Sequence, residues 1–137
     1  MADLVPYLTF DGRCADAMHF YAKTLGGKVV GIMTAAQTPM AADIGPGFAD
    51  HVMHACIEFD GRRLMASDSM GQPYNGMQGM WVSLHYTDPA EARRIFAALG
   101  EGGKVTMPID KTFWAEAFGM LVDRFGTPWM INCEPTS

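Results

Sequence analysis

The sequence predicts an α+β fold in which two βαβββ modules form a curled, mostly antiparallel eight-stranded sheet with a concave cleft. The first observation behind this prediction is an internal repeat. Phe10 and Tyr86 end matching apolar runs 76 residues apart, and Lys28 and Lys104 follow matching Gly-Gly pairs at the same offset. A repeat of half the chain length indicates two fused copies of one module, because solenoid repeats are about 20–50 residues long.

A second repeat, at an offset of 65, supports the same interpretation. Residues 59–66 and 124–131 both place a Gly turn before an apolar run. The alternative is coincidence, since Gly-Gly after a helix is a common stop signal. Because the two repeats occur in the same order, we expect the halves to superpose, with Met65 matching Met130.

The first half predicts one helix among four strands. Residues 13–25 carry apolar side chains at helical spacing, and Gly26 and Gly27 end this helix because Gly accepts the left-handed conformation. Residues 34–51 form a loop whose length is typical of functional or disordered segments. Alternating apolar residues predict strands at 5–10, 29–33, 52–59 and 63–67.

The second half repeats this plan. Asp88 and Pro89 predict the start of a helix over residues 89–99, as N-cap and first helical residue. Strands are expected at 80–86, 104–107, 119–123 and 128–133. We therefore expect a single domain over residues 1–137, with halves at about 1–69 and 80–137 joined by a link over 70–79.

Two amphipathic helices can cover only one face of such a sheet, so the other face should line the cleft. Successive strand side chains point to opposite faces, so alternate residues of each strand should point toward the helix and the others toward the cleft. A slip of one residue over 81–86 would instead bury His85 beneath a helix. The residues expected to bind a ligand in the cleft are Tyr7, His54, Met65, Ser67, Trp81, His85, Trp114 and Met130.

Composition excludes several classes of function. The 137 residues are 49% hydrophobic with a net charge of -5, and no Lys/Arg cluster favours nucleic-acid binding. No apolar run reaches the roughly 18 residues needed to span a membrane, and the first residues do not resemble a signal peptide. Three widely spaced cysteines argue against a disulfide framework and a structural zinc site, and favour a cytoplasmic protein. The twelve methionines are either adaptable core residues or the lining of a plastic apolar pocket.

Three stretches, Pro6–Gly12, Val52–Ala55 and Phe113–Trp129, carry a resemblance to a known family. The chain resembles the vicinal oxygen chelate superfamily (glyoxalase, bleomycin resistance and dioxygenase proteins), in particular its PhnB-like, 3-demethylubiquinone methyltransferase-like group. The resemblance implies the two-module fold predicted above. The methyltransferase name implies S-adenosylmethionine, but no Gly-rich nucleotide loop follows a strand here.

The resemblance also implies where a divalent metal would bind, namely on the concave face. The matching positions here are Val5, Met65, Trp81 (or Val82) and Met130. None of these side chains binds a hard or borderline divalent ion, since Met sulfur suits soft ions only. We therefore expect no metal and no cofactor, which argues against glyoxalase, dioxygenase and epimerase activities together.

The sequence thus favours a metal-independent small-molecule binding protein whose ligand it does not identify. The alternative is a lyase, isomerase or transferase that uses His54 or His85 as acid or base, because a histidine titrates near neutral pH. A purely structural dimer module is a third possibility. We expect a homodimer, because sheets of this superfamily often complete their cleft with a partner chain and an apolar loop spans 34–51.

Overall fold

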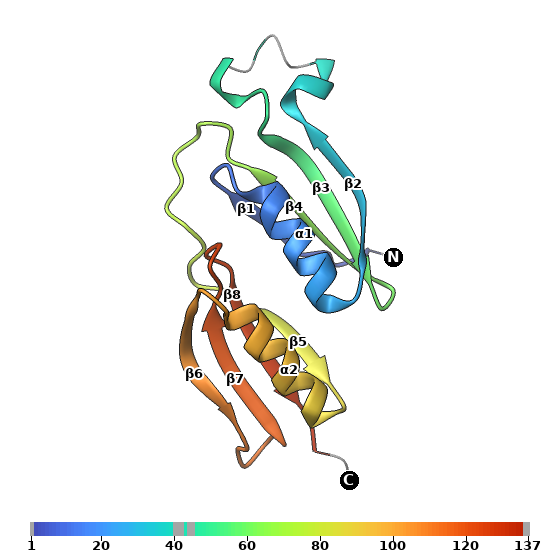
Figure 1. Cartoon of the computed structure of the whole chain (residues 1–137), viewed down its shortest axis with the longest axis vertical. Coiled ribbons are helices and arrows are strands. Elements are labelled where there is room, and N and C mark those ends of the chain that lie inside the picture. The colour runs from blue at the N-terminus through green and yellow to red at the C-terminus, as the bar shows by residue number, and fades with distance from the viewer. Residues whose placement is uncertain (1, 40–42, 44–45, 136–137) are drawn as a thin grey trace. The chain divides into compact units, whose positions relative to one another are not determined.

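The computed structural model describes residues 2–39, 43 and 46–135 (Figure 1). The chain forms two compact units, Met1–Gly76 and Met77–Ser137. Their boundary lies in the segment that was expected to link the two halves. In the part of the chain that the structure describes, each unit contains one α-helix and four strands. That the two units act as a single domain stays a prediction.

Unit 1 is a four-stranded mixed sheet with one helix. The strand order is β1-β4-β3-β2, in which β1 and β4 are parallel and the other pairs are antiparallel. The described residues of the loop between β2 and β3 include the short 3-10 helices η1 (Ala35–Gln37) and η3 (Pro46–Phe48). Residues 40–42 and 44–45 of that loop are outside the described residues. The elements of unit 1 are β1 (Tyr7–Phe10), α1 (Cys14–Leu25), β2 (Lys28–Thr34), β3 (Val52–Phe59) and β4 (Arg62–Asp68).

Unit 2 has the same topology. Its strand order is β5-β8-β7-β6, with β5 parallel to β8 and the other pairs antiparallel. The predicted α+β fold of two βαβββ modules is confirmed, with its eight strands in two four-stranded sheets. The elements of unit 2 are β5 (Val82–Tyr86), α2 (Pro89–Gly100), β6 (Lys104–Asp110), β7 (Ala117–Val122) and β8 (Pro128–Cys133).

The register of the strands confirms the internal repeat. Tyr7 lies opposite Met65 in unit 1, and Ser83 lies opposite Met130 in unit 2. These two pairs are related by the offsets of 76 and 65 found in the sequence. Each sheet therefore uses equivalent residues at its parallel strand pair.

The repeated Gly-Gly pair has a physical reason in both units. The first glycine of each pair, Gly26 or Gly102, has a left-handed φ of 73° or 75°. The second glycine lies against the backbone of the sheet. A Cβ at Gly27 would lie 2.1 Å from the carbonyl oxygen of Glu58, and one at Gly103 would lie 2.4 Å from the nearest carbonyl oxygen. Neither position has room for a side chain, so both glycines are required after each helix.

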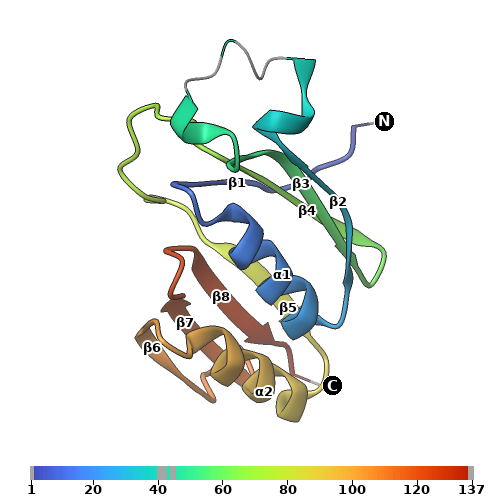
Figure 2. The ribbon, with the colours of Figure 1, turned by 45° about the horizontal axis from the view of Figure 1, so that its top comes forward.

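Each helix packs on one face of its own sheet, as Figure 2 shows for both units. The apolar stripes predicted for the helices are buried, as are the strand residues beneath them. Asp88 caps α2 as expected, because its carboxylate accepts a hydrogen bond from the backbone of Ala90. The largest fully buried side chains include Trp129, Tyr21, Phe10, Leu8, Met18, Ile57, Ile95, Leu99, Leu121 and Ile131.

A buried carboxylate, Asp68 at the end of β4, holds unit 1 together. Its Oδ1 accepts from the backbone N–H groups of Gly12 (2.9 Å) and Cys14 (3.0 Å), and its Oδ2 accepts from that of Val52 (2.8 Å). The N-cap residue of α1 is Arg13, whose side chain has no acceptor atom, so Asp68 takes over this role from a distant strand. Local sequence patterns gave no sign of this arrangement.

Asp123 plays a similar part in unit 2, in the turn between β7 and β8. Its Oδ1 accepts from the backbone N–H groups of Phe125 (2.8 Å) and Thr127 (3.0 Å). Its Oδ2 accepts from the indole Nε1 of Trp129 at 2.8 Å. The carboxylate therefore fixes both the turn and the largest side chain of the core.

We predict that Asp68→Ala lowers the free energy of unfolding by about 3 kcal/mol, because it leaves three N–H groups without an acceptor. Urea unfolding followed by circular dichroism measures this. The control is Asp11→Ala, since Asp11 is exposed and only accepts a long hydrogen bond from Ser69. Equal stability of the two variants would contradict this role of Asp68.

Candidate functional site

The candidate site is the face of each sheet that its helix leaves uncovered, here called the open face. In unit 1 the register places Tyr7, Met65 and Cys56 side by side across β1, β4 and β3. The neighbouring row, which contains Leu8 and Ala66, is buried beneath α1. Strand alternation therefore puts the first row on the open face, as the sequence predicted.

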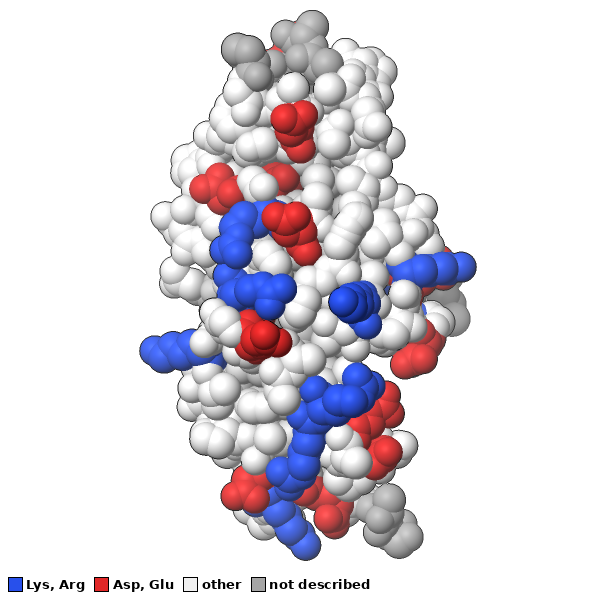
Figure 3. All heavy atoms as spheres, in the orientation of Figure 1, with Lys and Arg blue, Asp and Glu red and all other residues white. Residues whose placement is uncertain are grey.

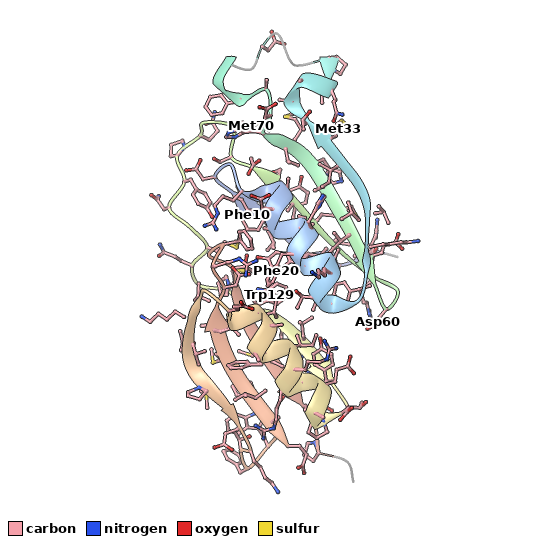
Figure 4. The ribbon with its side chains drawn as sticks, in the orientation of Figure 1. Phe10, Phe20, Met33, Asp60, Met70 and Trp129 are labelled. Carbon is pink, nitrogen blue, oxygen red and sulfur yellow. The ribbon has the colours of Figure 1, made fainter. Side chains whose placement is uncertain are left out.

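Tyr7 and His54 are the polar centre of the unit 1 open face. The phenol oxygen of Tyr7 shares a hydrogen bond of 3.1 Å with Nδ1 of His54, and their ring centroids are 5.8 Å apart. Tyr7 is 51% exposed. Ser67 lies opposite Thr9 in the parallel pair, and Met33 lies opposite His54 at the far end of β2 (Figure 4). The bond between Tyr7 and His54 leaves the other ring nitrogen, Nε2, without a hydrogen-bond partner among the described residues.

The open face of unit 2 is identified by a glycine. A Cβ at Gly119 would lie 2.6 Å from the ring of Phe96, which belongs to α2, so Gly119 faces the helix. Its neighbours Phe118 and Met120 therefore point to the opposite face. The register extends this face into two rows across all four strands: Ser83, Met130, Met120 and Met107, and His85, Asn132, Phe118 and Asp110.

His85 lies on the open face of unit 2, so the predicted register of residues 81–86 is correct. Its Nε2 is 2.9 Å from Oγ of Ser83, and its Nδ1 is 3.2 Å from Nδ2 of Asn132. Because an amide nitrogen only donates, Nδ1 accepts from Asn132, and Nε2 pairs with the hydroxyl of Ser83. A carboxylate oxygen of Glu134 lies 4.0 Å from the same Nδ1.

Two tryptophans lie beside these rows. Trp114, in the connection between β6 and β7, is 44% exposed and contacts Phe118 edge to face, with ring centroids 5.3 Å apart. The same connection exposes Phe113 almost fully, at 97%. Trp81 is 37% exposed and immediately precedes β5, because that strand begins at Val82 and not at the predicted residue 80.

The structure thus assigns the eight expected ligand residues to two units. Those of unit 1 are Tyr7, His54, Met65 and Ser67, and those of unit 2 are Trp81, His85, Trp114 and Met130. Sequence reasoning missed Asn132 and Met120, although alternation from Met130 and Gly119 identifies both. Asp68, which follows Ser67 on β4, is a buried structural carboxylate.

Other reactive groups are few. Among the described residues, no three His, Cys, Asp or Glu side chains gather where they could hold a metal ion. Burial, and then the nearby Asp68 carboxylate, raise the pKa of the Cys14 thiol to about 12, so this thiol is not a nucleophile.

No helix in the described part of the chain is long and apolar enough to cross a membrane. Acidic and basic side chains are interspersed on the surface seen in Figure 3.

These modules, each with one helix-covered and one open sheet face, define a protein of the vicinal oxygen chelate fold. A solved structure of this fold, a glyoxalase-related enzyme from Fulvimarina pelagi, covers 98% of this chain and 89% of its own, with a TM-score of 0.66 and 17% identity. At that identity the likeness shows the fold alone.

The family follows from residues 2–132, which match the family model described as 3-demethylubiquinone-9 3-methyltransferase. The chain belongs to this PhnB-like family. It is 35% identical to the protein YjdN of Escherichia coli, over 94% of this chain and 93% of YjdN. The protein PA1353 from Pseudomonas aeruginosa is 42% identical, with a TM-score of 0.91 over 98% of both chains.

Proposed function

We propose that this chain is a metal-independent small-molecule binding protein and that its ligand binds at the open faces. The observation that carries this proposal is the composition of those faces. Each combines methionine and aromatic side chains with one histidine that is held by a hydrogen bond, to Tyr7 in unit 1 and to Asn132 in unit 2.

Small-molecule sites have this composition, with a mostly apolar lining and a few placed polar groups. The half-exposed side chains of Tyr7, Met33 and Trp114 give up apolar contact with water when a ligand covers them. Methionine side chains also adapt to ligands of different shape, because they rotate about three bonds and are polarizable. The open faces are therefore suited to sequestering or sensing a compact, partly apolar molecule.

The second candidate function is acid–base catalysis by a lyase, isomerase or transferase. His54 fits this role better than His85, because its Nε2 is available while both ring nitrogens of His85 are engaged by neighbours. Tyr7 would then orient the imidazole through Nδ1. A compound that binds and is not converted favours the first function. A compound that the protein converts, and that the His54→Ala variant no longer converts, favours the second.

We predict that a panel of aromatic and alkyl fragments yields ligands in ligand-observed NMR. Trp114→Ser or Tyr7→Ser should weaken binding of these ligands about tenfold, or roughly 1.4 kcal/mol, because each removes an apolar wall of an open face. The matched control is Leu4→Ser, which removes a fully exposed apolar side chain that precedes β1. The proposal fails if no fragment binds, or if all three variants lose affinity equally.

We predict that the purified protein retains no stoichiometric zinc, nickel or iron after dialysis against a chelator. The reason is that Val5, Met65, Trp81 and Met130 occupy the positions where the superfamily places metal ligands, and none suits these ions. Elemental analysis measures the metal content. One tightly held metal ion per chain would contradict the metal-independent part of the proposal.

We further propose a cytoplasmic homodimer. Three free, buried cysteines are compatible with a reducing compartment. Phe113 and Leu4, which are almost fully exposed, favour a partner surface that covers apolar groups. Light scattering should therefore give about twice the chain mass of 15.0 kDa, and a monomer mass at micromolar concentration would contradict this. If the protein is a dimer and no fragment binds to it, the third possibility, a purely structural dimer module, is the one that remains.

A further inference from the structure

We propose that the open face of unit 2 binds a small primary amine with an aromatic or alkyl body. The ammonium group would bind at Asn132 and Glu134, and the body would lie across Met120 and Phe118. This inference rests on the proposed function and specifies its ligand class. It is carried by an unpaired polar atom, by the charges around that atom, and by the apolar rows beside it.

The unpaired atom is Oδ1 of Asn132. This side chain is only 8% exposed, and its Nδ2 donates to His85. Its Oδ1 is buried and has no hydrogen-bond partner among the described residues. A buried acceptor without a donor is destabilising, and a ligand N–H that reaches it would recover much of this lost free energy.

The charges around this atom favour a positive head group. Glu134 lies on the same side of the site, 4.0 Å from Nδ1 of His85. Asp110 ends the row that contains Asn132, and neither row of the open face contains Lys or Arg. Nε2 of His85 pairs with Ser83, while the Nδ1 side of the ring faces Asn132. An ammonium group supplies three donors to this set of acceptors.

The apolar part of the site begins on the next strand. Phe118 lies opposite Asn132, and Met120 lies opposite Met130, so a molecule held at Asn132 extends over β7. Adjacent strands are about 4.8 Å apart, which matches the distance from an amine to a ring across a two-carbon chain. Trp114 contacts Phe118 and provides a wall for the ring. An aromatic wall also attracts a nearby cation.

Oδ1 is covered in the unliganded chain, so a neighbouring group must move before a ligand N–H reaches it. The movable groups on this face are the half-exposed Trp114 and the unbranched Met130. A methionine changes rotamer readily. Amine binding should therefore alter the environment of Trp114.

The test compares three molecules of similar shape: 2-phenylethylamine, 2-phenylethanol and 3-phenylpropanoate. Isothermal titration calorimetry of the full chain should show at least tenfold tighter binding of the amine than of the alcohol, and the weakest binding for the carboxylate. Asn132→Leu, which removes the acceptor and keeps the volume, should abolish this preference. Glu134→Gln should reduce it.

The matched control is Glu91→Gln, because Glu91 is an exposed carboxylate of unit 2 that belongs to α2 and not to the open face. This variant should keep the full preference for the amine. Circular dichroism checks that each variant is folded. If Asn132→Leu does not fold, the amine preference of Glu134→Gln decides whether the inference holds. The inference is overturned if the alcohol or carboxylate binds as tightly as the amine, or if the preference survives in the folded variants of Asn132 and Glu134. It also fails if none of the three molecules binds while other fragments do, and that outcome leaves the proposed function intact.

Discussion

The rest of the structure depends on one constraint: each module has a single helix with which to cover a four-stranded sheet. Strand side chains alternate between faces, so the helix buries one set, such as Leu8 and Phe10, and leaves the other set uncovered. Tyr7, His54 and Met65 lie on the uncovered face for this reason. The candidate site is thus a direct consequence of how the core is built.

The features that depend on local pattern could be predicted from the sequence. The helices, the eight strands and the repeat follow from apolar spacing and Gly signals, and the second glycine of each pair proves as necessary as the first. The placement of His85 on the open face followed from the alternation of Val82 and Leu84. Local pattern is informative here because each sheet packs one face against its helix, so apolar residues alternate along the strands.

Features that depend on pairing between distant residues could not be predicted. Asp68 caps a helix that begins 54 residues earlier, and Asn132 reaches a histidine 47 residues away. Such hydrogen bonds leave no periodic signal, so neither the capping role of Asp68 nor the bond of Asn132 to His85 could be predicted. Both residues are polar and buried, and the difference between them is informative: Asp68 has its acceptors paired, while Asn132 keeps one unpaired. The first pattern stabilises the fold, and the second is the observation on which the proposed amine site rests.

The measurement that tests the central claim most directly is NMR of protein labelled at its methionine methyl groups, titrated with the aromatic fragment that binds most tightly. The chain has twelve methionines, of which Met65, Met120 and Met130 lie on open faces, while Met18 belongs to α1 and is fully buried. If the open faces bind ligand, the signals of open-face methionines shift in proportion to occupancy and that of Met18 stays fixed. Shifts confined to methionines off the open faces, or no shift at saturation, would contradict the account.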